Sequence, residues 1–163
     1  RSAEQIAVLR ALWSQEVVDF HGQWHHITHA GLSPLPVQRP IPIWFGVGSS
    51  QNPQPPDAVL RRVARLADGW SPNIPTNADG KSIVARVHQY AQEAGRNPAA
   101  LPLEVRDRIT GKSPAEWVNL VQAWADVAAT HIIVETRGGG LVFPHQHLAA
   151  LRQFQEVVGP VMR

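Results

Sequence analysis

The chain has 163 residues, 44% of them hydrophobic and 17% charged, which is the size and composition of one globular domain. It contains no cysteine, which excludes disulfides, thiolate metal sites and cysteine nucleophiles, and it lacks a run of about eighteen apolar residues, so we expect no membrane span. The net charge is only +2 and the basic residues are spread along the chain, which argues against a nucleic-acid partner. No signal peptide is recognisable and the first residue is Arg1, so we expect a trimmed chain or an internal fragment, located in the cytoplasm and forming a single domain over residues 1–163.

The first third of the chain predicts a helix followed by a small β excursion. Apolar residues at helical spacing favour an amphipathic helix over residues 3–14. Residues 17–28 contain β-branched and aromatic side chains around a glycine, which predicts a hairpin. Prolines then predict an extended segment over residues 33–42.

The rest of the chain alternates strands with helices. Strands are predicted at residues 43–47, 68–73, 102–110 and 131–136, and helices follow them at residues 57–67, 79–94, 114–128 and 145–158. Gly95 is expected to cap the second of these helices, and Ser113, Pro114 and Glu116 form a capping box that opens the third. Short loops between alternating elements predict an α/β fold with a parallel sheet and right-handed crossovers.

Apolar patterns also predict which side chains are buried. The third helix is expected to bury the stripe Trp117, Val118, Val121, Trp124, Ala125 and Ala128, and the last helix Leu148, Leu151, Phe154 and Val158. The continuous apolar run HIIVET at residues 131–136 is typical of a strand covered on both faces.

Two glycine-rich strand ends are candidate anion sites. In the stretch IWFGVGSSQ, the strand ends on Gly46, Gly48, Ser49 and Ser50. Glycines let the backbone approach a phosphate closely and serine hydroxyls add donors, but the pattern matches neither the dinucleotide fingerprint nor a P-loop. A phosphate site and a strained connecting loop therefore both stay open.

The second strand end, ETRGGG, offers Arg137 as a fixed cation. This anion-site interpretation competes with a simpler one, in which the segment is a flexible glycine loop with a solvated arginine. The charged run Arg106, Asp107 and Arg108 on the preceding predicted strand is either an internal arginine–aspartate pair or a polar site at the mouth of a barrel.

Other catalytic signals are weak. The histidines at positions 21, 25, 26 and 29 are close in sequence, but adjacent histidines on a strand point to opposite faces, so surface histidines are favoured over a metal site. The serines do not form a nucleophile elbow, and the pattern identifies no general acid or base, so no catalytic residue is assigned.

The sequence nevertheless resembles a known family. The stretches LRALWSQEVVDFHGQWHHI, LSPLPVQRPIPIWFGVGSSQ and RRVARLADGW are similar to the C-terminal half of luciferase-like monooxygenases, particularly the branch that uses a deazaflavin coenzyme, with FMN-dependent relatives. The resemblance implies a partial (half) TIM-type (β/α)8 barrel: four parallel βα units as barrel strands five to eight, preceded by a helix and a small β hairpin. It also implies that Gly46, Gly48, Ser49 and Ser50 contact the phosphate-bearing side of the cofactor, and we add Arg137 as a fifth cofactor-binding residue.

Two functions stay open on this basis. One is hydride transfer between a deazaflavin coenzyme or FMN and an unknown organic substrate. The alternative is a non-catalytic half-barrel that serves as a binding or assembly module, because the pattern identifies no acid–base constellation and the resemblance covers only the C-terminal half of the family. A half-barrel also leaves two open sheet edges, which predicts either a homodimer that closes a pseudo-barrel or a monomer in which the hairpin at residues 17–28 covers one edge.

Overall fold

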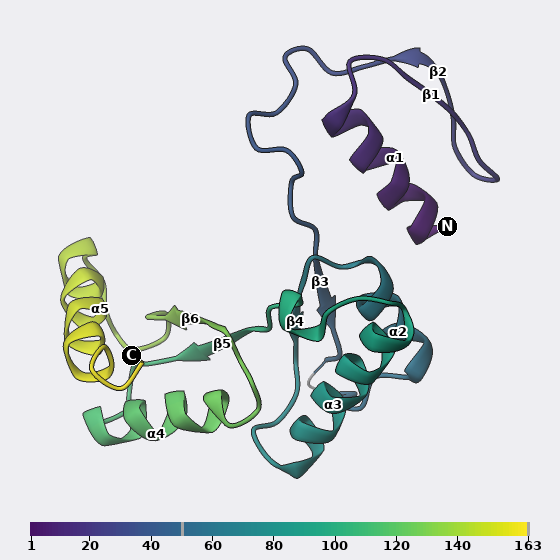
Figure 1. Ribbon diagram of the computed structural model, residues 1–163. Helices are drawn as coiled ribbons and strands as arrows, with labels where there is room; N and C mark the ends of the chain where they lie inside the picture. The colour runs from purple at the N-terminus through teal and green to yellow at the C-terminus, as the bar shows by residue number, and fades with distance from the viewer. Residues whose placement is uncertain (50, 163) are drawn as a thin grey trace. The chain divides into compact units, whose positions relative to one another are not determined.

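A computed structural model describes residues 1–49 and 51–162 of the chain (Figure 1). It divides into two compact units, Arg1–Ile43 and Trp44–Arg163. The single domain over residues 1–163 therefore stays a prediction, and the two units are described separately. Within the described residues, no helix has the length and apolar character that a membrane crossing requires.

The first unit is a helix with a hairpin, as predicted. Helix α1 spans Ser2–Ser14, and strands β1 (Val18–His21) and β2 (His26–Ala30) pair antiparallel. Its buried apolar residues are few: Ile6, Val8 and Val18. Because this core is small, we expect polar contacts to contribute much of the stability of the first unit.

One carboxylate, Glu4 on α1, fastens the hairpin turn. Its Oε1 accepts hydrogen bonds from the backbone N–H groups of Trp24 (2.8 Å) and His25 (2.6 Å), and its Oε2 accepts one from Gln23 (3.1 Å). Nδ1 of His25 lies 2.9 Å from the same Oε1. A side chain on Gly22 would meet the carboxylate at 2.4 Å, which explains the glycine in this turn.

The second unit contains the strand–helix alternation. Its elements are β3 (Trp44–Val47), α2 (Asp57–Leu66), β4 (Gly69–Pro72), α3 (Ala78–Glu93), the short 3-10 helix η1 (Pro98–Ala100), β5 (Glu104–Arg108), α4 (Pro114–Ala125), β6 (His131–Glu135) and α5 (Pro144–Val158). The predicted caps are confirmed: Gly95 has a left-handed φ of 72°, and Ser113 and Glu116 form the capping box at the start of α4. The α/β class with parallel strands is confirmed as well.

The strands pair in chain order. β3 pairs parallel with β4, and β5 pairs parallel with β6. A single parallel bridge between Trp70 and Leu103 joins the two pairs, with the N–H of Trp70 donating to the carbonyl of Pro102 at 3.0 Å. Because this bridge lies before the carboxyl ends of β4 and β5, these ends are free to diverge.

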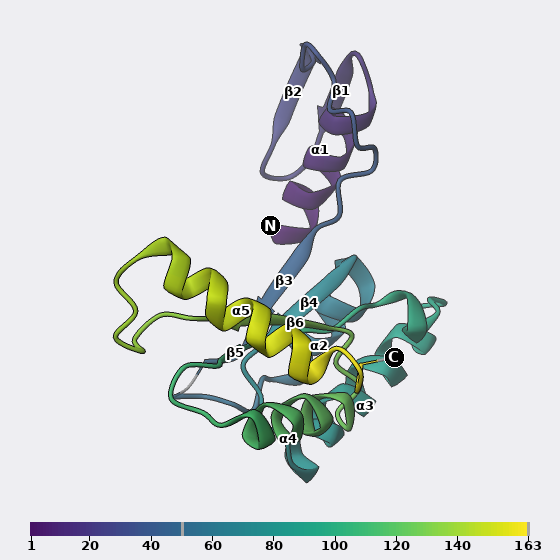
Figure 2. The same cartoon turned by 90° about the vertical axis from the view of Figure 1, so that its left-hand side faces the viewer.

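Helices cover one face of the strands. α2 and α3 pack beside β3 and β4, and α4 packs against α5 beside β5 and β6 (Figures 1 and 2). Strand residues that face the helices belong to the apolar core, among them Val47, Trp70, Leu103 and Val105. The alternate strand residues face the other way and form what we call the inner face.

On the inner face, the first and last strands of the second unit are in contact through their side chains. The ring of Trp44, on the first strand, makes an edge-to-face contact with the ring of His131 on the last, with centroids 5.6 Å apart. The indole of Trp44 also lies over Gly69, where a β-carbon would approach it to 2.6 Å. This contact links two stretches of the sequence that carried the family resemblance, PIPIWFG and ADGW.

Several burial predictions are wrong. Ala125 and Ala128 are exposed, because α4 ends at Ala125 and Ala128 has a left-handed φ of 65°. Leu148 on α5 is 52% exposed. β6 is not covered on both faces, since His131 is exposed and its other residues are only half-buried.

Candidate functional site

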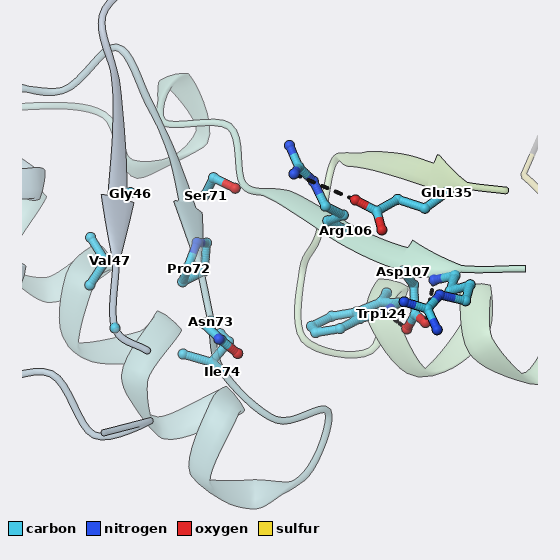
Figure 3. A pocket seen from close by; sticks show the side chains of 12 residues that line it. Gly46, Val47, Ser71, Pro72, Asn73, Ile74, Arg106, Asp107, Trp124 and Glu135 are labelled. Atoms are coloured by element: carbon cyan, nitrogen blue, oxygen red, sulfur yellow. Dashed lines mark hydrogen bonds and ion pairs between the residues drawn. The ribbon is translucent and has the colours of Figure 1, made fainter. Parts of the chain in front are cut away.

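A cavity of about 540 Å³ lies at the carboxyl ends of the four parallel strands. Parallel α/β sheets bind ligands at this edge, and the volume suits a small molecule. Figure 3 shows the ends of β3 and β4 on one side of the cavity and those of β5 and β6 on the other. We call these the glycine wall and the charged wall.

The glycine wall presents bare backbone. Gly46 and Gly48 line the cavity together with Ser71, Pro72 and Asn73 from β4 and the residue after it. A β-carbon on Gly46 would have open space around it, with no heavy atom within 4 Å. Gly48 has a φ of 77°, and a β-carbon there would lie 3.1 Å from the carbonyl oxygen of Asn73, so both conformation and space require glycine.

Ser49 lies just beyond this wall in a tight turn. Its backbone N–H donates to the carbonyl of Asn52 (3.2 Å), and its Oγ accepts from the N–H of Asn52 (3.1 Å). Ser50, the fourth residue of the predicted loop site, lies outside the described residues. Helix α2 begins only at Asp57, so the glycine turn is not itself the N-terminus of a helix.

The charged wall contains the three consecutive charged residues of β5 for which the sequence left two interpretations open. Arg106, Asp107 and Arg108 all line the cavity, as does Glu135 from the end of β6. Nη1 of Arg106 lies 3.5 Å from Oε1 of Glu135 (Figure 3). The partner of Arg106 is therefore a glutamate on the neighbouring strand. Of the two alternatives left open for this run, Arg106 does not form the arginine–aspartate pair, and all three residues line the cavity.

Asp107 turns toward helix α4. Its Oδ2 accepts a hydrogen bond from Nε1 of Trp124 (3.3 Å), and its Oδ1 lies 3.4 Å from Nζ of Lys112. The alternation of side chains along β5 explains this, because Arg106 and Arg108 point to the opposite face.

Arg137 sits at the edge of the site. Its Nη2 donates to Oε1 of Glu135 at 2.9 Å, while its side chain is 78% exposed. It is not among the described residues that line the cavity. Among the described residues that line the cavity, Glu135 is the one whose side chain pairs with Arg137.

The glycines after β6 have a packing role. The guanidinium of Arg108 lies against Gly138, whose β-carbon would be 3.2 Å from Nη1. A β-carbon on Gly139 would clash with Thr110 at 2.3 Å, and Oγ1 of Thr110 donates to the carbonyl of Arg137 (3.2 Å). These contacts hold the loop after β6 against the loop after β5.

Sequence reasoning missed part of the cavity. Ser71, Asn73, Trp124 and Glu135 were not singled out, although all four line it. The signal was present for three of them, because the stretches DGWSPN and VETRGGG end the second and fourth predicted strands at the same edge of the sheet. Trp124 carried no such signal, since it sits in the apolar stripe of a helix.

The four clustered histidines lie on the hairpin strands and in the turn between them. The rings of His21 and His26 lie 6.0 Å apart, and the backbone N–H of His29 donates to Asp19. Over residues 1–49 and 51–162, no three histidine, aspartate or glutamate side chains form a group that could hold a metal ion.

Comparison with known proteins identifies the family. The model of the luciferase-like monooxygenases matches residues 1–142. The chain belongs to this family. Its resemblance to that family, first seen in the sequence motifs, is thereby confirmed.

Two of the similar proteins are an FMNH2-dependent and an F420-dependent enzyme. The chain is 29% identical over 123 residues to the FMNH2-dependent dimethylsulfone monooxygenase of Pseudomonas putida, covering 76% of this chain and 31% of that protein. It is 25% identical over 136 residues to the F420-dependent glucose-6-phosphate dehydrogenase of Tsukamurella paurometabola, covering 80% and 37%. An uncharacterized protein of Mycobacterium tuberculosis is 35% identical over 96 residues, covering 59% and 30%. The chain thus spans about a third of the length of these relatives.

Solved structures share the fold. The coenzyme F420-dependent tetrahydromethanopterin reductase of Methanopyrus kandleri superposes with a TM-score of 0.72 at 13% identity, over 98% of this chain and 62% of that one. An F420-dependent secondary alcohol dehydrogenase, solved with an F420–acetone adduct, gives a TM-score of 0.54 at 14% identity, over 96% and 52%. At these identities the likeness concerns the fold.

Proposed function

We propose that this chain supplies the phosphate-binding side of a deazaflavin or FMN site in an oxidoreductase that acts on a small organic substrate. The observation that carries the proposal is the open backbone at Gly46, at the edge of the sheet where ligands of parallel α/β folds bind. Family membership and the FMNH2- and F420-dependent relatives support the cofactor class.

The residues present fit such a group. Gly46 and Gly48 leave room for a phosphate to reach the main chain, and among the described residues the hydroxyl hydrogen of Ser49 has no acceptor. In this proposal Ser50 adds a second hydroxyl, and Arg137, which lies beyond the described lining of the cavity, adds a cation. The bound cofactor would accept or donate the hydride, while the chain binds and orients it and keeps its phosphate at the glycine wall.

The architecture proposed for this site is half of a (β/α)8 barrel. Strands β3, β4, β5 and β6 would be barrel strands five to eight, and the cavity at their carboxyl ends would be part of the site at the top of the barrel. A further proposal is a homodimer in which β3 of one copy pairs with β6 of the other. Within the described residues, each of these strands pairs on one side only.

The cofactor proposal is tested with two glycine variants of opposite character. Gly46→Ala places a methyl group in the open space of the glycine wall, so we expect FMN and deazaflavin binding to fall while stability is unchanged. Gly95→Ala lies outside the cavity at a φ of 72°, so we expect a loss of about 1 kcal/mol in stability with unchanged binding. Fluorescence titration and urea unfolding measure the two effects.

A folded parent chain that binds neither FMN nor deazaflavin at micromolar concentration would contradict the proposal and favour a non-catalytic module. Equal binding by the parent and Gly46→Ala would show that the cofactor phosphate lies elsewhere.

The dimer proposal is tested by sedimentation at micromolar concentration. A monomer of 17.9 kDa would rule the dimer out.

A further inference from the structure

The charged wall has more positive than negative charge. Arg106 and Arg108 come from β5, and Lys112 follows in the next loop, whereas the carboxylates that line the cavity are Asp107 and Glu135. Lys112 is engaged with Asp107 through its Nζ. One carboxylate, Glu135, is therefore left to balance the two arginines that line the cavity.

That balance is incomplete. Glu135 is largely buried, with 17% of its side chain exposed, and its Oε1 is shared between Arg106 and Arg137. The side chain of Arg106 lines the cavity and is 59% exposed, so more than half of it remains accessible. Arg108 is exposed and has no carboxylate within ion-pair distance among the described residues.

The two arginines are also placed to act on one ligand. They are two residues apart on a strand, so their side chains leave the same face about 7 Å apart along the backbone. Each guanidinium offers several N–H donors in a planar fork that matches an oxyanion. The guanidinium of Arg108 lies beside Gly138, where an added β-carbon would be 3.2 Å from Nη1.

We propose that Arg106 and Arg108 form an oxyanion subsite, so that the substrate carries a phosphate or sulfonate group, and that Glu135 holds Arg106 in place and competes with the ligand for it. This inference rests on the proposed function, because it assigns the substrate class of the same cavity. The cofactor phosphate would lie on the glycine wall and the substrate oxyanion on the charged wall, across the cavity (Figure 3).

Glycerol 3-phosphate is the probe, glycerol is its neutral match, and calorimetric titration of the full chain is the measurement. We expect Arg106→Gln and Arg108→Gln each to weaken glycerol 3-phosphate binding about tenfold or more, as loss of a charge-assisted hydrogen bond does. Arg62→Gln removes the same charge from an exposed position on α2 and is expected to bind like the parent. Glu135→Gln is expected to bind several-fold more tightly, a gain that a misfolded variant does not produce.

A second arm distinguishes the two sources of phosphate. Glycerol 3-phosphate binding that persists in saturating FMN supports a substrate subsite separate from the cofactor. Mutual exclusion would assign the arginines to the cofactor phosphate and overturn the proposal. It would also be overturned if both arginine variants bound like the parent, or if glycerol bound as well as glycerol 3-phosphate.

The two proposals fail in different ways. If FMN and deazaflavin do not bind, the arginine-dependent binding of glycerol 3-phosphate still reports on the charged wall. If FMN binds and glycerol 3-phosphate does not, the cofactor site stands and the oxyanion subsite is wrong.

Discussion

Different interactions stabilise the interior of each of the two compact units. The first, Arg1–Ile43, buries three apolar side chains and relies on the carboxylate of Glu4 to join its helix to its hairpin. The second, Trp44–Arg163, is built around an apolar core in which Leu60, Trp70 and Ile83 are fully buried. A segment of about forty residues cannot bury enough apolar surface to fold by that means alone, so polar contacts carry more of its organisation.

Truncating a core side chain of the second unit should have the largest effect on stability. Trp70→Ala removes a side chain with 0% exposure, so we expect it to lower the free energy of unfolding by about 3–5 kcal/mol in urea unfolding. Trp24→Ala is the matched change in the first unit. Its side chain is 55% exposed, and we expect an effect of no more than about 0.5 kcal/mol. Similar losses for the two tryptophans would contradict the difference between the units.

Glu4→Gln is expected to loosen the first unit and leave the second unchanged. A neutral amide has one acceptor oxygen, so it cannot replace the hydrogen bonds that the two carboxylate oxygens accept from Gln23, Trp24 and His25. Hydrogen exchange should become faster at these three amides and stay the same in α4. Glu16→Gln, an exposed carboxylate in the same unit, is the control and should leave exchange unchanged.

Acid should act on the first unit through the same carboxylate. Burial would raise the pKa of Glu4, but the hydrogen bonds from the Trp24 amide, the His25 ring and the neighbouring amides outweigh it and lower the pKa below its ordinary value of 4.5. Because the folded-state pKa is the lower one, this stabilisation is complete above pH 4.5 and is lost as the pH falls through the folded-state value.

The measurement is the amide resonance of Trp24 followed by NMR from pH 6 downward, roughly two pH units on either side of the ordinary carboxyl pKa. The parent should show a transition below pH 4.5, and Glu4→Gln should not. A transition of equal size in both proteins would mean that another carboxylate is responsible.

Local sequence patterns predicted the order of elements because each depends on neighbours in the chain. The capping box at Ser113 and the left-handed turn at Gly95 are decided within a few residues, and both are confirmed. The burial of Leu148 and Ala128 was predicted wrongly, since burial depends on which elements pack together and where a helix ends.

In the candidate site, too, features that depend on local sequence could be predicted and those that depend on tertiary packing could not. Gly46 and Gly48 could be predicted to lie at a ligand-binding edge, because a parallel sheet brings all its strand ends there. The pairing of Arg106 with Glu135 could not, since it joins residues 29 positions apart whose contact depends on the register of β5 with β6. Nothing in the local sequence of β5 distinguishes Glu135 from Asp107 as the partner.

The smallest expected effect concerns the Ser113 cap at the exposed start of α4. Unlike the contacts of Glu4 in the first unit, this cap should stabilise its own helix and leave the rest of the unit unchanged. Ser113 accepts a hydrogen bond from the N–H of Glu116 through its Oγ, and Glu116 accepts one from the N–H of Ser113 at 2.7 Å. Ser113→Ala removes the first of these at the start of α4, so we expect a loss of about 1 kcal/mol in urea unfolding. Ser113→Asn keeps a capping side chain and should restore nearly all of it. Since the core that α4 buries through Trp117, Val121 and Trp124 is untouched, hydrogen exchange in β5 should not change. If Ser113→Ala instead loosened the whole second unit as strongly as Trp70→Ala, that unit would depend on polar contacts as the first one does.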